Sequence, residues 1–152
     1  MNDGPLIQAE DLASRLGVSA LRLFDCRFDL ARPDAGRARY EEEHLPGAAY
    51  ADLNRDLSAP ETLVSGRHPL PAPAAFEARL RRWGVDGDSV VVAYDDGNAM
   101  YAARLWWMLR WLGHRKSLVL DGAVRHGGEL GRPVEEALTS HQLGIFGARG
   151  RH

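Results

Sequence analysis

Residues 90–112 read VVVAYDDGNAMYAARLWWMLRWL and contain the two segments that decide the fold. The first five residues are apolar at every position, which is typical of a strand buried on both faces of a parallel sheet. After the DDGN turn, large apolar residues recur at helical spacing, which predicts a mostly buried helix over residues 99–112. A buried strand followed directly by such a helix is the repeating unit of an α/β domain.

The same alternation of short aliphatic runs and helical periods extends to both sides of this unit. Gly17 and Gly84 follow two of the expected helices and are typical of helix C-termini. Two stretches between the elements are expected to be loops. The polar stretch 28–43 would hold a single helical turn near residues 39–43, and the proline-rich stretch 52–73 would form a long ordered loop. We predict strands over residues 21–26, 48–51, 90–94 and 117–121 and helices over residues 9–16, 74–83 and 99–112.

Composition and charge exclude several kinds of partner. Nineteen basic and twenty-one acidic residues leave a formal charge of −2, with no block of one sign, so neither nucleic acid nor an anionic membrane is an expected partner. No stretch approaches the roughly 20 apolar residues of a membrane span. Cys26 is the only cysteine, so no disulfide can form within the chain. These features favour a cytoplasmic protein.

Six short motifs, in order and at characteristic intervals, carry a family resemblance. They are Asp25-Cys26-Arg27, His44-Leu45-Pro46-Gly47-Ala48, GRHPLP at 66–71, ARLWWMLR at 103–110, Gly113-His114 and Val119-Leu120-Asp121-Gly122. Together they resemble the N-terminal domain of the thiosulfate and 3-mercaptopyruvate sulfurtransferases. The resemblance implies a single rhodanese-like α/β domain over residues 5–135, with a parallel five-stranded sheet and helices on both faces. Residues 136–152 would form an irregular C-terminal tail.

One stretch departs from the pattern of this family. Its members follow the Asp-Gly pair with a second glycine and, a few residues later, a tryptophan, whereas Ala123 and Gly127 occur here. The departure lies in residues 123–129 and affects the expected packing of the last helix. The pattern of the family returns at residues 131–135.

The resemblance also implies a function, sulfane sulfur transfer from thiosulfate or 3-mercaptopyruvate to a thiophilic acceptor. Such enzymes have two similar domains in tandem, and the cysteine that carries the sulfur belongs to the second. That cysteine needs a depressed pKa, which backbone amides and a helix N-terminus provide in the turn after the central strand. Here the resemblance places Asp95 at the position of the nucleophile, and a carboxylate cannot accept sulfane sulfur. No catalytic residue is therefore expected, and the vestigial active-site loop consists of Asp95, Asp96, Gly97, Asn98, Ala99 and Met100.

Physical chemistry suggests another role for the aspartates of this loop. A helix N-terminus favours a carboxylate by roughly 0.3 to 1 kcal/mol, and its first amides need acceptors. One hypothesis is that Asp95 or Asp96 caps the helix that follows and replaces the missing anion. The alternative is that both are solvated turn residues.

Cys26 is a minor candidate for a reactive thiol. The charge of neighbouring Arg27 would lower the thiol pKa and favour a redox or sulfur-accepting role. The alternative is a small buried residue at a strand end, which is the commoner situation for cysteine. Asp25 and Arg27 are expected to form an ion pair that fastens the adjoining loop.

Neither a metal nor a cofactor is expected. The histidines show no ligand spacing; they are His44, His68, His114, His126, His141 and His152. A phosphatase would need a cysteine and an arginine around the anion loop, where Asp95 and Ala102 lie. No phosphate loop or dinucleotide fingerprint follows a strand.

Two functional hypotheses remain from the sequence. In the first, the chain is the half of a sulfurtransferase that is inactive alone and truncated before the catalytic domain, and it handles a small sulfur donor only with a catalytic rhodanese domain supplied in cis or in trans. In the second, it is a free-standing pseudoenzyme or binding module, or the product of a truncated gene. A domain that packs against a partner should also keep an exposed apolar patch.

Overall fold

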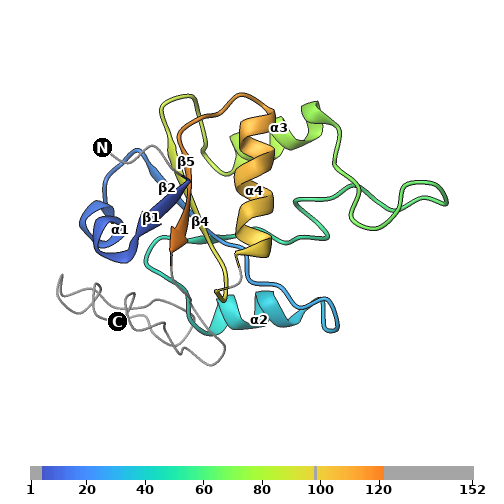
Figure 1. The fold of residues 1–152 in the computed structure, drawn as a ribbon, viewed down its shortest axis with the longest axis horizontal. Coiled ribbons are helices and arrows are strands. Elements are labelled where there is room, and N and C mark those ends of the chain that lie inside the picture. Colours follow the sequence, from blue (N-terminus) through green and yellow to red (C-terminus); the bar gives the residue numbers. More distant parts are fainter. Residues whose placement is uncertain (1–4, 98, 122–152) are drawn as a thin grey trace.

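The computed structural model describes residues 5–97 and 99–121, which form a parallel sheet flanked by helices (Figure 1). The strands lie in the order β1-β5-β4-β2-β3, and every neighbouring pair is parallel. The predicted fold class, α/β with a parallel five-stranded sheet, is confirmed. In chain order the elements are β1 (Leu6–Gln8), α1 (Ala9–Arg15), β2 (Leu21–Asp25), α2 (Ala35–Glu42), β3 (Ala49–Tyr50), α3 (Pro73–Arg82), β4 (Val90–Tyr94), α4 (Met100–Trp111) and β5 (Ser117–Asp121).

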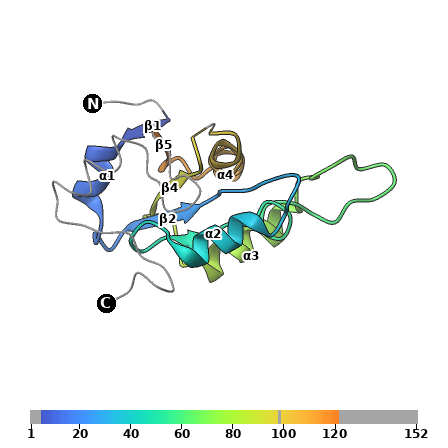
Figure 2. The same ribbon diagram turned by 90° about the horizontal axis from the view of Figure 1, so that it is seen from below.

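β4 lies at the centre of the sheet, and its side chains alternate between two hydrophobic cores. Val91 and Ala93 belong to the core under α3 and α4, whereas Val92 and Tyr94 belong to the core on the side of α1 and α2. The four residues are at most 1% exposed. Burial on both faces explains the unbroken apolar run in the sequence, and the view from below shows helices on both sides of the sheet (Figure 2).

The parallel arrangement brings the ends of three strands together. In the register of the sheet, Asp25 at the end of β2 lies beside Tyr94 of β4 and Tyr50 of β3. The segments that leave these strands therefore meet at one edge of the sheet. In open α/β sheets this carboxyl edge is where ligands bind.

The stretch 28–43 is more helical than the sequence predicts. α2 covers Ala35–Glu42, whereas a loop with one helical turn was expected. The helix is polar, so it shows no apolar period to detect. Its contact with the sheet depends on Gly36, which has no side chain and so approaches the backbone carbonyl of Arg27 and the hydroxyl of Tyr50 closely.

β1 is a strand that the apolar pattern alone does not predict. It has three residues and pairs with β5 at the other end of the described chain. Only Ile7 of β1 is buried, so the periodicity is too short to recognise. The remaining strands and helices agree with the predicted ranges within two residues at each end.

The long proline-rich stretch is the predicted loop. No helix or strand interrupts residues 51–72, and Arg104 of α4 fastens the loop to the domain. Its guanidinium donates to the carbonyl oxygens of Leu57 (2.8 and 3.1 Å) and His68 (2.9 Å). The tip of the loop, with Leu63 and Val64, projects away from the domain (Figure 1).

α4 is buried on one side only. Leu105, Met108 and Leu109 are fully buried, as predicted. Trp107 and Trp111 are 48% and 39% exposed, so the expectation that the helix would be mostly buried is wrong for its outer face. The sheet covers only the inner side of the helix, although the outer side also carries large apolar residues.

The expected tail at residues 136–152 and the irregular segment at residues 123–129 lie outside the described residues. None of the helices in the described part of the chain has both the length and the apolar character that crossing a bilayer requires.

We predict that Gly36→Ala destabilises the domain. A methyl group at this position would collide with the Arg27 carbonyl and the Tyr50 hydroxyl, which overrides the gain in helix propensity. Overpacking of this kind costs about 1–3 kcal/mol. Gly87→Ala is the matched control, because the added methyl group meets no atom within 4 Å. Urea unfolding of both variants measures the difference, and equal stabilities would contradict the packing argument.

Candidate functional site

The carboxylate of Asp95 lies inside a nest of backbone amides between β4 and α4. Oδ1 accepts hydrogen bonds from the amides of Gly97 (3.0 Å) and Ala99 (3.1 Å), and Oδ2 from those of Tyr101 (3.1 Å) and Ala102 (2.9 Å). Asp95 is 2% exposed. The hypothesis that an aspartate caps this helix is confirmed for Asp95, and the alternative of a solvated turn residue is wrong for it.

The backbone bends sharply to build this nest. Ala99 adopts a left-handed conformation with φ of 64°, which is uncommon for a residue with a side chain, and Gly97 has φ of 119°. The bend turns successive amides toward one point. Convergent amides at a helix N-terminus form an anion site, and here the anion belongs to the protein itself.

Of the other residues of the predicted vestigial loop, Gly97 and Ala99 contribute amides to the nest, whereas the side chain of Asp96 pairs with Arg39. Asp96 is partly exposed and lies 3.8 Å from Nη1 of Arg39 on α2, a distance typical of a weak surface ion pair. Met100 is 59% exposed at the start of α4. Asn98 lies outside the described residues.

Cys26 lies just beyond β2 and is sealed from solvent. Its residue is 1% exposed, and its amide donates to the Tyr94 carbonyl at 2.7 Å. Burial raises the thiol pKa well above its ordinary value, and the negative charges of Asp25, Asp95 and Asp56 raise it further. The expectation that Arg27 lowers this pKa is wrong, because the charge of Arg27 is engaged by Asp25.

Asp25 and Arg27 form the predicted ion pair, and both side chains are completely buried. Nη2 of Arg27 lies 2.7 Å from Oδ2 of Asp25, and it also donates to the carbonyl of Glu43 at 2.7 Å. Burial alone lowers the pKa of Arg27, but the hydrogen bond and charge of Asp25 outweigh it, so the net shift is upward. The pair joins β2 to the end of α2 and offers no free charge to a ligand.

Tyr94 completes this network, a role that the sequence did not predict. Its hydroxyl donates to Oδ2 of Asp25 (3.0 Å) and accepts from the amide of Leu45 (3.1 Å). Burial, and then the charge of Asp25, raise its pKa well above the usual value. The available signal was a tyrosine inside an otherwise apolar strand, because a buried hydroxyl requires a partner.

The histidines that the structure describes have structural contacts. Nδ1 of His44 lies 2.7 Å from the carbonyl of Tyr40, Nε2 of His68 lies 2.8 Å from Oδ1 of Asn54, and Nε2 of His114 lies 2.9 Å from the carbonyl of Ser89. Within residues 5–97 and 99–121, no group of three or more His, Cys, Asp or Glu side chains is placed to hold a metal ion.

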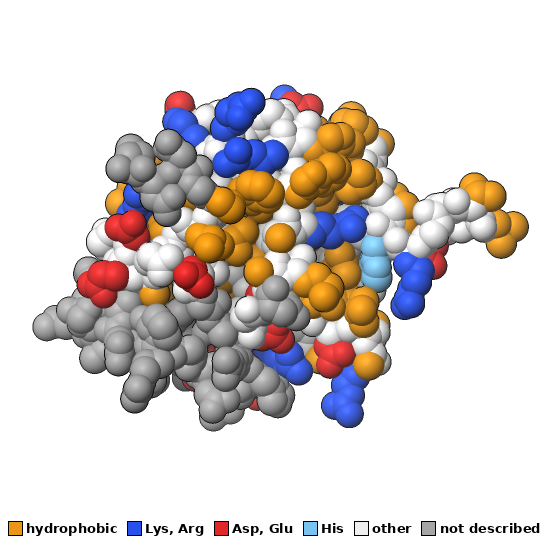
Figure 3. All heavy atoms as spheres, in the orientation of Figure 1, with side chains coloured by type: hydrophobic (Ala, Val, Ile, Leu, Met, Phe, Trp, Pro, Cys, Tyr) orange, Lys and Arg blue, Asp and Glu red, His pale blue; other side chains and the backbone are white. Residues whose placement is uncertain are grey.

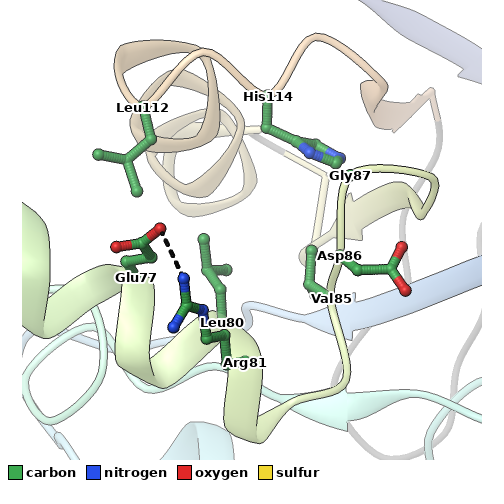
Figure 4. Close-up of a pocket in the computed structure, with 8 residues that line it drawn as sticks. All are labelled: Glu77, Leu80, Arg81, Val85, Asp86, Gly87, Leu112 and His114. Atoms are coloured by element: carbon green, nitrogen blue, oxygen red, sulfur yellow. Dashed lines mark hydrogen bonds and ion pairs between the residues drawn. The ribbon is translucent and has the colours of Figure 1, made fainter.

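A surface pocket of about 340 Å³ lies between α3 and the C-terminal end of α4 (Figure 4). Its charged groups are satisfied locally: Glu77 accepts from Arg81 at 3.2 Å, and the amide of Asp88 helps to lower the pKa of Asp86. It lies beside the start of β4, at the end of the sheet opposite the carboxyl edge. This position favours a gap between packed elements over a ligand site. Its lining residues are Glu77, Leu80, Arg81, Val85, Asp86, Gly87, Leu112 and His114.

Comparison with known families agrees with this architecture. The model of the rhodanese-like domain family matches residues 8–126. The chain belongs to the rhodanese-like domain family. This membership confirms the resemblance noted in the sequence.

Relatives of this rhodanese-like domain are named as sulfurtransferases. The chain is 50% identical over 148 residues to a probable 3-mercaptopyruvate sulfurtransferase of Pseudomonas aeruginosa, covering 96% of the chain and 52% of that protein. It is 39% identical over 140 residues to the putative thiosulfate sulfurtransferase SseB of Mycobacterium tuberculosis, covering 91% and 49%. The chain thus spans about half the length of these curated relatives.

Solved structures give the same picture. The 3-mercaptopyruvate sulfurtransferase from Leishmania major superposes with a TM-score of 0.76 at 29% identity, over all of this chain and 38% of that one. SseA from Escherichia coli, also a 3-mercaptopyruvate sulfurtransferase, gives a TM-score of 0.71 at 29% identity, over 94% of this chain and 50% of that one.

We predict that Asp95→Ala lowers the free energy of unfolding by about 2–4 kcal/mol, because it leaves buried amides without an acceptor. Asp96→Ala is the matched control in the same loop and should cost less than about 1 kcal/mol, since its ion pair is long and partly exposed. Thermal unfolding of both variants provides the measurement. Similar losses of unfolding free energy in the two variants would show that the hydrogen bonds of the amide nest do not stabilise the loop.

We also predict that the Cys26 thiol of the folded protein reacts very slowly with Ellman's reagent at about pH 8. The ordinary thiol pKa is about 8.5, so a raised pKa leaves little thiolate at this pH, and burial blocks access. Unfolding in guanidinium should restore the ordinary rate, and the same thiol then serves as its own control. Fast labelling of the native protein is the contrary result.

Proposed function

We propose that this rhodanese-like domain is the non-catalytic part of a sulfurtransferase. It would contribute to sulfane sulfur transfer, from thiosulfate or 3-mercaptopyruvate to a thiophilic acceptor, only together with a catalytic rhodanese domain supplied in cis or in trans. The domain would extend over residues 5–135. The names of the relatives support the reaction, and the half-length match supports a second domain.

The observation that carries the proposal is the occupied amide nest. Sulfur transfer by this chemistry requires a thiolate stabilised by amides at a helix N-terminus. In this chain the carboxylate of Asp95 takes that place and accepts its hydrogen bonds. A carboxylate cannot form a persulfide, because it has no sulfur atom that can bond to the transferred sulfur.

The second supporting observation concerns the remaining thiol. Cys26 is the only cysteine of the sequence and is 1% exposed. Its raised pKa keeps it protonated near neutral pH. It therefore lacks both the access and the ionisation that attack on a sulfur donor requires.

The direct test is the formation of thiocyanate from cyanide by the purified chain, with thiosulfate or 3-mercaptopyruvate as donor. We expect no signal above the reaction without protein. A signal that disappears in Cys26→Ser would contradict the proposal and make Cys26 a sulfur carrier.

A second arm tests the position of Asp95 itself. In a Cys26→Ser background, Asp95→Cys should introduce a thiol whose pKa the amide nest lowers. The ultraviolet absorbance of the thiolate, followed against pH, should then appear at a lower pH than for the matched variant Asp96→Cys in the same background. Equal thiol pKa values in the two variants would mean that the nest does not stabilise a thiolate and that the assignment of Asp95 is wrong.

The alternative is a free-standing pseudoenzyme or binding module. The exposed apolar face of α4 is expected of a domain that packs against a partner and does not distinguish the two. The coding sequence downstream distinguishes the two: a rhodanese domain with a cysteine in its active-site loop supports the proposal, and the lack of one supports the alternative. The cytoplasmic location expected from the single cysteine stays a prediction.

A further inference from the structure

The outer side of α4 carries a stripe of four side chains, of which three are exposed and Arg104 is partly buried under the loop at residues 51–72. Met100, Arg104, Trp107 and Trp111 follow one another at spacings of three or four residues and so lie on one side of the helix. We call these four residues the α4 face. Met100 is 59%, Trp107 48% and Trp111 39% exposed. In the space-filling view the hydrophobic side chains form a broad patch over this helix (Figure 3).

The composition of the α4 face is that of an interface. Aromatic residues, methionine and arginine are the types enriched where proteins associate. Exposed tryptophans are costly to leave in water because each presents a large apolar area.

Three side chains of the α4 face already make contacts within the domain. The rings of Trp107 and Trp111 are stacked, with centroids 6.0 Å apart and planes 11° from parallel. Arg104 is held by the carbonyls of Leu57 and His68. Association therefore orders few side chains, which lowers its entropic cost.

Charge is distributed with opposite signs at the two ends of α4. Asp29 and Asp96 lie near its start, close enough for their charges to act on the hydroxyl of Tyr101. Arg39 lies 3.8 Å from Asp96 and offsets only part of this charge. Beyond its end lie Arg115 and Lys116, both exposed. Basic side chains border the upper edge of this surface in Figure 3.

We infer that the α4 face is a self-association surface on which a second copy of this chain packs with its α4 antiparallel, about a two-fold axis. Antiparallel packing brings the acidic end of each helix to the basic end of the other. With the axis near Trp107, Arg104 of each copy lies opposite Trp111 of the other, a cation–π pair, and the two Arg104 side chains are separated by about 10 Å along the helices. Such an interface is self-complementary, as two-fold symmetry requires.

Sedimentation equilibrium of the full chain over a wide range of concentration tests this inference. We expect a reversible dimer that weakens in high salt. The double variant Trp107→Ser, Trp111→Ser should raise the dissociation constant by about tenfold or more. Its matched control is Leu63→Ser, Val64→Ser, which removes two fully exposed apolar side chains away from the α4 face and should leave the constant unchanged.

Charge reversal tests the antiparallel arrangement. Arg115→Glu alone should weaken the dimer, and adding Asp96→Lys in the same chain should restore it, since the two ends again carry opposite charges. Circular dichroism and thermal melting confirm that each variant is folded. A wild-type chain that stays monomeric at all concentrations, or a dimer lost only in the Leu63, Val64 control, overturns the inference; the first result would leave the α4 face to a different partner.

Discussion

The first backbone amides of a helix have no acceptor within the helix, and at the start of α4 they point into the protein. Those of Tyr101 and Ala102 are buried, so an internal acceptor must be present if β4 is to lead into α4 through so short a bend. Asp95 supplies it through both carboxylate oxygens. This constraint determines the left-handed backbone at Ala99 and the depth at which α4 enters the core. The largest helix of the described domain depends on one buried carboxylate.

A second buried carboxylate, that of Asp25, lies at the end of the neighbouring strand β2. Asp25 is neutralised by Arg27 and hydrogen-bonded by Tyr94, so no charge is left unpaired. Arg27 also donates to the Glu43 carbonyl, and Tyr50 donates to the Arg27 carbonyl at 2.7 Å, so the network fixes the end of α2 to the sheet and joins β3 to the segment that follows β2. Cys26 is buried and close enough to both carboxylates for their charges to act on its thiol. The arrangement that stabilises the carboxyl edge of the sheet therefore also raises the pKa of this thiol.

These features divide the surface of the domain into two regions of different character. At the carboxyl edge, where α/β proteins bind small ligands, the carboxylates of Asp25 and Asp95 are hydrogen-bonded within the protein. On the outer side of α4, by contrast, tryptophans that could have been buried are exposed to solvent. This division agrees with the non-catalytic role that we propose for the domain. The relatives, which are about twice as long, are consistent with such a role within a larger enzyme.

By itself, the sequence determined the α/β class and most of the strands and helices, because buried apolar runs, helical periods and turn residues act over short distances along the chain. For the helix cap it offered Asp95 or Asp96 and left solvated turn residues open, and the structure selects Asp95. It also placed Asp25 and Arg27 together, since two residues apart on a strand they share a face. Only the tertiary structure decided the rest. β1 forms by pairing with the edge strand β5, and α2 packs on the sheet because Gly36 fits against the Arg27 carbonyl. The Tyr94 hydroxyl of β4 donates to Asp25 on the neighbouring strand β2. The exposure of Trp107 and Trp111 could not be predicted either, because the sequence of an apolar helix does not show which of its sides faces the sheet. Each of these outcomes depends on a contact between residues far apart in the chain, and local patterns carry no record of such contacts.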